Sequence, residues 1–262
     1  MTFNVRATDL DALNSLTKYP SIPTYHALGD RGSLTEEATA FTGPVIGTEK
    51  IDGTNARVIS LPDGTWLLGS REELLCAKGD LIGNPAQGIV AALRGLADRL
   101  NPFIDSIMVY YLEVYGGKVT AASKQYTGDR VVGHRLFDIV VIPDDEAETL
   151  LAKPQAEISS WREHGGQPFL AEPDLAWMAS KEGLDLAPRL FTLDAAELPR
   201  EVDKTLAFLA ERLPQTLSAL DDSAGGKPEG IVLRTADRNV IAKARFEDYN
   251  RTLRRRSRNS PT

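Results

Sequence analysis

The chain has 262 residues, 42% of them hydrophobic, which suffices for a sizeable core in one domain or in one domain with a small appendage. Its formal net charge of −7 argues against a protein whose whole surface binds a polyanion. The single cysteine, Cys76, excludes an internal disulfide framework, and with only three scattered histidines it also excludes a Cys/His zinc site. Neither a stretch of about 18 apolar residues nor a hydrophobic signal core is present, so we expect a soluble cytoplasmic protein with no membrane segment.

The positive charge is concentrated near the C-terminal end. Residues 243–258 hold seven basic side chains and two acidic ones, a net charge of +5, which leaves −12 for the rest of a chain whose total is −7. A local basic segment of this kind can contact phosphates even though the whole surface cannot. The alternative is a disordered, solubilising terminus.

The first part of the chain combines one short helix with β-like segments. Residues 1–40 mix polar and apolar side chains, with a helical stretch at 9–16 followed by a proline-punctuated loop. From residue 45 to residue 68 the pattern is typical of short strands rich in β-branched residues, interrupted by a glycine-containing turn at 49–55. We expect a lead-in over 1–40, and then strand, tight turn and strand.

The middle of the chain alternates between helical and strand patterns. Apolar residues at helical spacing predict a helix over 85–100, and two long apolar runs predict strands over 107–115 and 136–142. Residues 144–222 have a mainly helical pattern, with the best amphipathic stretch at 201–213. We interpret this block as an insertion or lid packed on the sheet.

The chain returns to strand patterns at 230–234 and 240–243. Because helices do not alternate regularly with strands, an α+β fold with largely antiparallel sheets is favoured over a doubly wound parallel one. We therefore expect one main domain over residues 41–250, followed by a basic tail over 251–262.

Lys50 is the residue most informative about function. It lies in the run EKIDGTN, residues 49–55, between two β-branched segments. Taken alone, a lysine and an aspartate beside a glycine turn are common in solvated hairpins. Three further charged signatures end or interrupt strands in order, and they are LEVYG at 112–116, EGIVLR at 229–234 and KAR at 243–245.

With this ordered set, residues 45–250 resemble the covalent nucleotidyltransferases, which comprise DNA ligases, RNA ligases and mRNA capping enzymes. Within them the chain looks most like the RNA ligase 2 type of RNA ligase. The resemblance implies an ATP-grasp-like adenylation domain of antiparallel sheets. It also implies a three-step reaction in which a lysine attacks the ATP α-phosphate, AMP moves to an RNA 5′-phosphate, and a 3′-hydroxyl displaces AMP. ATP, Mg²⁺ or Mn²⁺, RNA with 5′-phosphate and 3′-hydroxyl ends, a monomeric enzyme and a role in RNA repair follow as expectations.

The residue chemistry supports Lys50 as the nucleophile. A nucleophilic lysine must lose its proton, which desolvation or neighbouring cations such as a metal ion, Lys243 and Arg245 promote. Because Lys243 and Arg245 alternate with alanines, both point to one face of a strand, as a clamp on a triphosphate requires. The family prefers lysine at both positions. Arg245 keeps the positive charge but replaces the compact ammonium group of a lysine with a planar guanidinium.

The expected metal-binding residues are the three carboxylates Asp52, Glu113 and Glu229, which lie at separate strand ends. A magnesium ion bridging phosphate oxygens needs hard oxygen ligands, often through water. In the family, the residues matching Glu113 and Glu229 serve the metal, its waters or the ribose, and the sequence does not say which does which. The alternative for each is an ordinary surface charge.

Four further positions match nucleotide contacts of the family, and each has a structural alternative. Glu49 matches the residue that reads the adenine amine, and Asn55 an asparagine near the metal and phosphates, although an asparagine beside a turn is often only a turn former. Arg71 matches an arginine that touches the nucleotide and the RNA 5′-phosphate, with a rim ion pair as the alternative. Phe137 matches the ring that stacks on adenine, with core packing as the alternative.

Only 17 residues follow Arg245, so we expect no C-terminal oligonucleotide-binding (OB) domain of the kind that DNA ligases and capping enzymes carry. This favours an RNA ligase. A DNA ligase, or another nucleotidyltransferase that adenylylates a 5′-phosphorylated acceptor, stays open as the alternative, and so does a nucleotide- or RNA-binding module without turnover.

Overall fold

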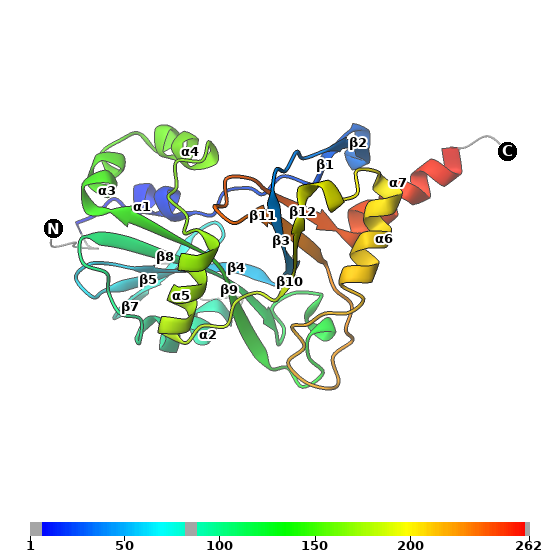
Figure 1. The fold of residues 1–262 in the computed structure, drawn as a ribbon. Helices are drawn as coiled ribbons and strands as arrows, with labels where there is room; N and C mark the ends of the chain where they lie inside the picture. The colour runs from blue at the N-terminus through cyan, green and yellow to red at the C-terminus, as the bar shows by residue number, and fades with distance from the viewer. Residues whose placement is uncertain (1–6, 82–87, 260–262) are drawn as a thin grey trace. The chain divides into compact units, whose positions relative to one another are not determined.

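A computed structural model describes residues 7–81 and 88–259 (Figure 1). The chain divides into two compact units. Unit 1 comprises the segments Met1–Ser21, Gly53–Ser123 and Arg130–Leu186, and unit 2 comprises Ile22–Asp52, Lys124–Asp129 and Ala187–Thr262. The chain therefore crosses from unit 2 to unit 1 between Asp52 and Gly53, inside the turn that follows Lys50.

Unit 1 is built on a six-stranded antiparallel sheet with the order β7-β6-β5-β4-β8-β9 (Figure 1). Its strands are β4 (Thr54–Ser60), β5 (Trp66–Ser70), β6 (Leu74–Ala77), β7 (Asp80–Leu81), β8 (Ser106–Gly116) and β9 (Val132–Pro143). Its helices are α1 (Leu10–Thr17), α2 (Ile89–Ala97), α3 (Asp144–Leu151), α4 (Gln155–Glu163) and α5 (Glu172–Glu182).

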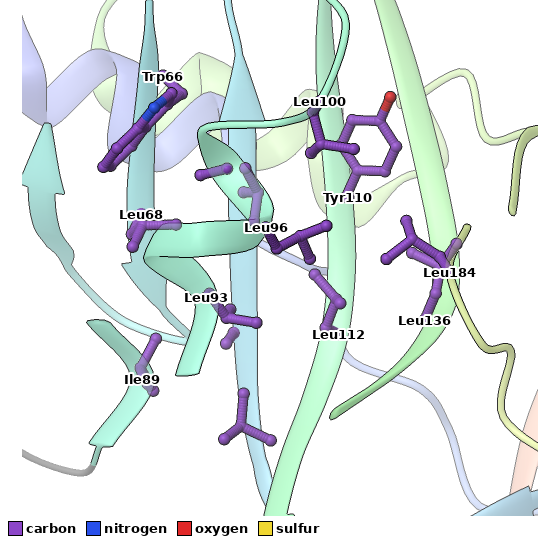
Figure 2. Close-up of a cluster of buried hydrophobic side chains, with 14 of the residues drawn as sticks. Trp66, Leu68, Ile89, Leu93, Leu96, Leu100, Tyr110, Leu112, Leu136 and Leu184 are labelled. Atoms are coloured by element: carbon purple, nitrogen blue, oxygen red, sulfur yellow. The ribbon is translucent and has the colours of Figure 1, made fainter. Parts of the chain in front are cut away.

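One face of the unit 1 sheet forms a hydrophobic core with α2 (Figure 2). Ile89, Leu93 and Leu96 recur at helical spacing on α2, and they pack with alternate residues of the strands, among them Leu68 and Leu112. Leu93 is fully buried, so its truncation to alanine would cost about 2–5 kcal/mol. Since strand residues alternate between faces, the polar residues between these positions point to the other face.

Unit 2 contains a four-stranded antiparallel sheet with the order β10-β3-β11-β12 and a separate β1-β2 hairpin. Its strands are β1 (His26–Leu28), β2 (Leu34–Ala38), β3 (Pro44–Lys50), β10 (Arg189–Asp194), β11 (Gly230–Thr235) and β12 (Ile241–Arg245), and its helices are α6 (Val202–Arg212) and α7 (Phe246–Asn259). Short 3-10 turns lie at Asp30–Gly32, Ser123–Gln125 and Ala195–Glu197. Val45, Ile231, Leu233 and Ala244 form the buried face of the sheet with residues of α6 and α7.

The α+β fold with antiparallel sheets is confirmed, and the elements expected from periodicity are present. The helix expected at 9–16 is α1, which begins after Asp9, whose carboxylate accepts hydrogen bonds from the N–H groups of Asp11 and Ala12. The helix expected at 85–100 is α2, and its first expected residues lie outside the described part of the chain. No helix that the structure describes has the length and apolar character needed to cross a bilayer.

The interpretation of residues 144–222 as one helical insertion is wrong. Helices α3, α4 and α5 belong to unit 1, whereas β10 and α6 belong to unit 2. The strand β10 pairs with β3, with Leu193 opposite Val45. Its sequence, RLFTLD, is too short to separate from the neighbouring helical patterns by periodicity. The expected division into lead-in, domain and tail stays a prediction, although residues 251–259 belong to α7.

Candidate active site

Lys50 is the last residue of β3, and the register of the unit 2 sheet places it in a row with two others. Lys50 lies opposite Gly230 on β11, and Gly230 lies opposite Arg245 on β12. Residues in one row share a face, so the side chains of Lys50 and Arg245 flank a position without a side chain. The next row on the same face contains Thr48, Val232 and Lys243. Two basic residues of β12 therefore lie on the face that carries Lys50.

An ion pair holds the amine of Lys50. Its Nζ donates a hydrogen bond to Oε2 of Glu229 over 2.6 Å, and the two side chains are 25% and 16% exposed. Burial raises the pKa of the Glu229 carboxyl, and the negative charge of Asp52 adds to the rise, while Lys50 and Arg245 oppose it. The two carboxylates and two of the cations expected at the site thus act on one another within unit 2.

Tyr126 anchors the turn after Lys50, although no sequence motif marks it as a site residue. The backbone N–H of Asp52 donates to the Tyr126 hydroxyl over 2.6 Å, and this tyrosine is fully buried. Burial raises the pKa of Tyr126, and the nearby charges of Glu49, Asp52 and Glu229 raise it further. Tyr126 lies in a short loop with no motif, so nothing in the sequence distinguishes it from an ordinary core tyrosine.

Glu49 points to the opposite face of β3 from Lys50, because strand residues alternate. Glu49 is 2% exposed, and its carboxylate accepts hydrogen bonds from the hydroxyl of Thr216, from the Leu217 N–H at 3.0 Å and from the Ser218 hydroxyl at 2.9 Å. Glu49 therefore anchors the 216–218 loop to β3. Its expected role in reading adenine stays a prediction.

Arg245 makes a bidentate ion pair with Asp248, which lies three residues further along the chain. Its Nε donates to Oδ2 over 2.7 Å and its Nη2 to Oδ1 over 3.1 Å. The Asp248 side chain is 3% exposed and that of Arg245 is 37% exposed. Burial lowers the pKa of Arg245, but the hydrogen bonds to Asp248 and the negative charges of Asp248, Glu229 and Glu247 together outweigh burial and raise that pKa.

In unit 1, Asn55 and Glu113 lie opposite each other on β4 and β8, on the face of the sheet away from α2. Glu113 Oε1 accepts a hydrogen bond from the Gly53 N–H at 3.1 Å. A Cβ on Gly53 would meet the Val114 carbonyl oxygen at 2.4 Å, so only glycine fits at this approach. The buried Oδ1 of Asn55 accepts no hydrogen bond from the described residues, which leaves it able to receive a donor from a ligand.

Arg71 lies in a tight turn whose neighbours are anchored to α1. The Ser70 hydroxyl accepts hydrogen bonds from the N–H groups of Glu72 and Glu73 at 3.2 and 3.1 Å. Asn14 donates from Nδ2 to the Glu72 carbonyl at 2.9 Å. The Arg71 side chain is 56% exposed, and its Nε lies 3.5 Å from Glu72 Oε1, so the ion pair named as its alternative is present without burying the guanidinium.

The buried side chain of Arg57 also stabilises the turn that contains Arg71. Arg57 on β4 is fully buried, donates from Nη1 to the Arg71 carbonyl at 3.4 Å and from Nη2 to Asn14 Oδ1, and burial lowers its pKa to about 10. A Cβ on Gly69 would meet Arg57 Nε at 2.7 Å. The glycine in the run LLGS therefore makes room for a structural arginine.

Phe137 lies at a bulge in β9, where the register with β8 shifts between Tyr111 and Leu112. It is half-buried, and its ring lies 5.0 Å from Tyr19, edge to face, and 6.3 Å from Tyr111, stacked. The Tyr19 hydroxyl donates to Asp138 Oδ2 over 2.6 Å. The bulge thus sets Phe137 apart from the regular strand while aromatic neighbours hold its ring.

In unit 2, five of the expected site residues lie at one end of the sheet and in the turn beyond it: Lys50, Asp52, Glu229, Lys243 and Arg245. Glu49 lies on the opposite face of β3. Unit 1 places Asn55 beside Glu113, and it carries Arg71 and Phe137 on other segments. Among residues 7–81 and 88–259, no group of three or more His, Cys, Asp or Glu side chains is arranged to hold a metal ion.

The fold is that of nucleotidyltransferase-type RNA ligases. Three similar solved structures are mutants of Naegleria gruberi RNA ligase with ATP and Mn, with TM-scores of 0.53, 0.53 and 0.54 and identities of 14%, 15% and 14%. The matches cover 81%, 90% and 90% of this chain and 52%, 62% and 61% of the ligase chains. The chain therefore spans between half and two thirds of their length. No curated protein matches the sequence significantly.

Residues 43–246 match the family described as RNA ligase. The chain belongs to the RNA ligase family, a family of ligase enzymes. The expected family is confirmed, and the expected activity and the roles of the individual site residues stay predictions.

Proposed function

We propose that the protein is an ATP-dependent RNA ligase that joins 5′-phosphate and 3′-hydroxyl RNA ends through a lysyl-AMP intermediate on Lys50. The main support is the 2.6 Å contact between Lys50 Nζ and Glu229 Oε2. This contact lies at the end of the unit 2 sheet, where Arg245 is in the same row of paired residues as Lys50. The exposed pair Lys204–Glu201 has a similar contact at 2.7 Å, so the support comes from the partly buried position of the Lys50–Glu229 pair beside Arg245. A nucleophile has to be positioned before it reacts.

In the first step, the lone pair of Nζ forms a bond to the α-phosphorus of ATP, and the bond to the bridging oxygen breaks with release of pyrophosphate. The amine must first lose its proton, and Glu229 Oε2 lies within hydrogen-bond distance to accept it. The raised pKa of Glu229 makes it a better base than an exposed carboxylate.

In the second step, an oxygen of the RNA 5′-phosphate attacks the lysine-bound AMP, the P–N bond breaks and Lys50 regains a free amine. In the third step, the RNA 3′-hydroxyl attacks the 5′-phosphorus, loses its proton and displaces AMP. Each step transfers one phosphoryl centre, so the protein's work is positioning and stabilising negative charge. Lys243 and Arg245, on the face that carries Lys50, are the residues we assign to the triphosphate.

The carboxylates fit a divalent ion that arrives with the nucleotide. The charge of Asp52 raises the pKa of Glu229, and a cation between the two would relieve that repulsion. Without a ready cluster of three ligands among the described residues, such an ion would be held jointly by phosphate oxygens and by these carboxylates through water. The similar Naegleria ligase structures hold ATP and Mn, which supports ATP with Mg²⁺ or Mn²⁺ for this chain, where the ion would stabilise charge on the phosphates.

For the unit 1 residues we propose the roles that the family resemblance implies. Phe137 offers a half-buried ring for adenine, and the Oδ1 of Asn55 offers an acceptor beside Glu113. Arg71 is exposed on an anchored turn, where it can meet a nucleotide or an RNA 5′-phosphate. A monomeric enzyme, a cytoplasmic location and a role in RNA repair complete the proposal.

The test is labelling with α-³²P ATP, GTP or NAD in Mg²⁺ or Mn²⁺, followed by addition of 5′-phosphorylated RNA or DNA. We expect label from ATP on the wild type and none on Lys50→Ala, and transfer of the label to RNA. Label that persists on Lys50→Ala would move the nucleophile elsewhere. Transfer to DNA in preference to RNA would replace the proposed substrate with a DNA acceptor.

A further inference from the structure

The ion pair between Arg245 and Asp248 determines which part of the guanidinium is available to a ligand. A guanidinium has five N–H groups in a rigid plane. Asp248 accepts from the Nε–H at 2.7 Å and from one Nη2–H at 3.1 Å. Among the described residues, the Nη1 amine and the second Nη2 hydrogen have no hydrogen-bond partner, and they form the end of the guanidinium, next to the edge that Asp248 binds.

Asp248 is itself held rigidly. Its carboxylate is buried in the first turn of α7, and its Oδ1 also accepts from Nη2 of Arg251 at 2.6 Å. The same Arg251 nitrogen donates to the Gly32 carbonyl at 3.0 Å. Two arginines thus share one buried carboxylate, one from the sheet and one from the helix.

The position of Arg245 makes this restraint relevant to the proposed reaction. Arg245 lies across Gly230 from Lys50, and its charge acts on Glu229, the partner of Lys50. Without a partner, the Arg245 side chain would sample several rotamers. Because two of its nitrogens donate to Asp248, the guanidinium has a fixed orientation, and its remaining N–H groups can donate to two phosphate oxygens.

We propose that Asp248 is a positioning residue for nucleotide binding: it holds the Arg245 guanidinium so that its free end lies in the Lys50 row, ready for the oxygens of a nucleoside triphosphate. This inference rests on the proposed function. The role proposed for Asp248 also explains why residue 245 is an arginine. A planar guanidinium can bind Asp248 with two of its nitrogens and still offer N–H groups to a phosphate. A lysine at position 245 has one ammonium group, which the Asp248 carboxylate would attract.

The experiment measures the rate of Lys50 adenylylation against ATP concentration for the full chain and four variants. Asp248→Asn keeps the shape but weakens the restraint, and we expect the apparent KM for ATP to rise at least tenfold, since small misplacements at a reacting centre cost up to about 100-fold. Arg245→Lys should also be impaired, because Asp248 captures the amine. In the double variant, the neutral amide at position 248 no longer captures the lysine introduced at position 245, so the losses should not multiply.

Arg251→Ala is the matched control. It removes the other arginine on Asp248 and its contact with Gly32, so a purely structural role of Asp248 would be disturbed equally. We expect Arg251→Ala to lower the melting temperature and to raise the KM for ATP far less than Asp248→Asn does, because the Asp248 carboxylate still accepts both hydrogen bonds from Arg245. If Arg251→Ala raises the KM as Asp248→Asn does, the positioning role is overturned.

The remaining outcomes separate this inference from the function on which it rests. A wild type that takes no label from ATP would overturn the proposed function and this inference with it. A labelled wild type with an unimpaired Asp248→Asn variant would overturn the inference alone. Should Asp248→Asn not fold, Arg245→Lys decides the matter, because wild-type kinetics in that variant would contradict the capture of lysine by Asp248.

Discussion

Lys50 and Arg245 lie in one row of the unit 2 sheet, each opposite Gly230. The glycine is required by contact, because a Cβ there would meet the Ala244 carbonyl oxygen at 2.2 Å and the Arg245 Cα at 2.8 Å. Gly230 is itself buried, so the two basic side chains flank a strand position that has no side chain and no room for one.

Gly230→Ala should destabilise the protein and stop adenylylation. Forcing a methyl group against backbone typically costs about 1–3 kcal/mol, and relief would move Arg245 away from Lys50. Thermal unfolding and α-³²P ATP labelling measure the two effects. Gly95→Ala on α2 is the control, since its Cβ would meet nothing within 4 Å and alanine favours a helix. Wild-type labelling in Gly230→Ala would contradict the prediction.

Glu229→Gln should abolish activity without loss of stability at neutral pH. Burial raises the folded-state pKa of Glu229, so ionising it costs free energy of folding above that pKa, and the cost disappears as the pH falls through it. We therefore expect the melting temperature of Glu229→Gln, relative to the wild type, to be highest near neutral pH and to fall at acidic pH. A variant much less stable than the wild type at pH 7 would mean that the ion pair to Lys50 dominates.

Much of the strand and helix content could be predicted because it follows from short-range pattern. The helix α1 has its cap at Asp9, and the core-facing residues of α2 recur at helical spacing. The bounds of β8 follow from its apolar run to within one residue, whereas β9 begins at Val132, four residues before the strand expected at 136–142. The hairpin of β1 and β2 was not predicted, because its strands are short, partly exposed and weakly alternating.

The sequence indicated candidate site residues where charged residues end strands, and it gave no signal where a polar group acts through burial. Lys50 and Glu229 carry recognisable neighbours in sequence, and the structure pairs them. Tyr126, Asp248 and Arg57 each hold a site residue through hydrogen bonds from distant or unpatterned positions. Pairing across the fold decides their roles, and sequence spacing does not encode it.

Tyr126→Phe should slow adenylylation while leaving the fold intact. The change removes the hydroxyl that accepts the Asp52 N–H, so the turn after Lys50 loses an anchor worth about 0.5–1.5 kcal/mol. Tyr25→Phe is the matched control, because Tyr25 lies in the same unit and its hydroxyl donates to the Pro199 carbonyl at 3.0 Å. Both variants should lose similar stability in denaturant titrations, but only Tyr126→Phe should react slowly. Equal labelling rates for the two would leave Tyr126 with a packing role alone.

The arginines of α7 should divide into two functional groups. Arg255 donates to the Arg31 carbonyl at 2.7 Å, and Arg256 binds Glu36 and donates to the Leu34 carbonyl at 3.1 Å, so both tie α7 to the β1-β2 hairpin segment. In the part of the chain that the structure describes, Arg254 and Arg258 are exposed and their side chains make no hydrogen bond or ion pair. If α7 contacts RNA phosphates, the second pair is free to do so.

Replacing Arg254 and Arg258 together by alanine should therefore flatten the dependence of RNA binding on salt concentration, by a slope of about 1–2 in log–log form, without changing the melting temperature. Replacing Arg255 and Arg256 together should instead lower the melting temperature. Fluorescence anisotropy with 5′-phosphorylated RNA over a salt series measures the slope, and Lys50 adenylylation should stay at the wild-type rate in the first variant. Identical slopes in the wild type and Arg254→Ala/Arg258→Ala would show that α7 does not contact RNA and that its basic residues serve only the hairpin contact and solvation.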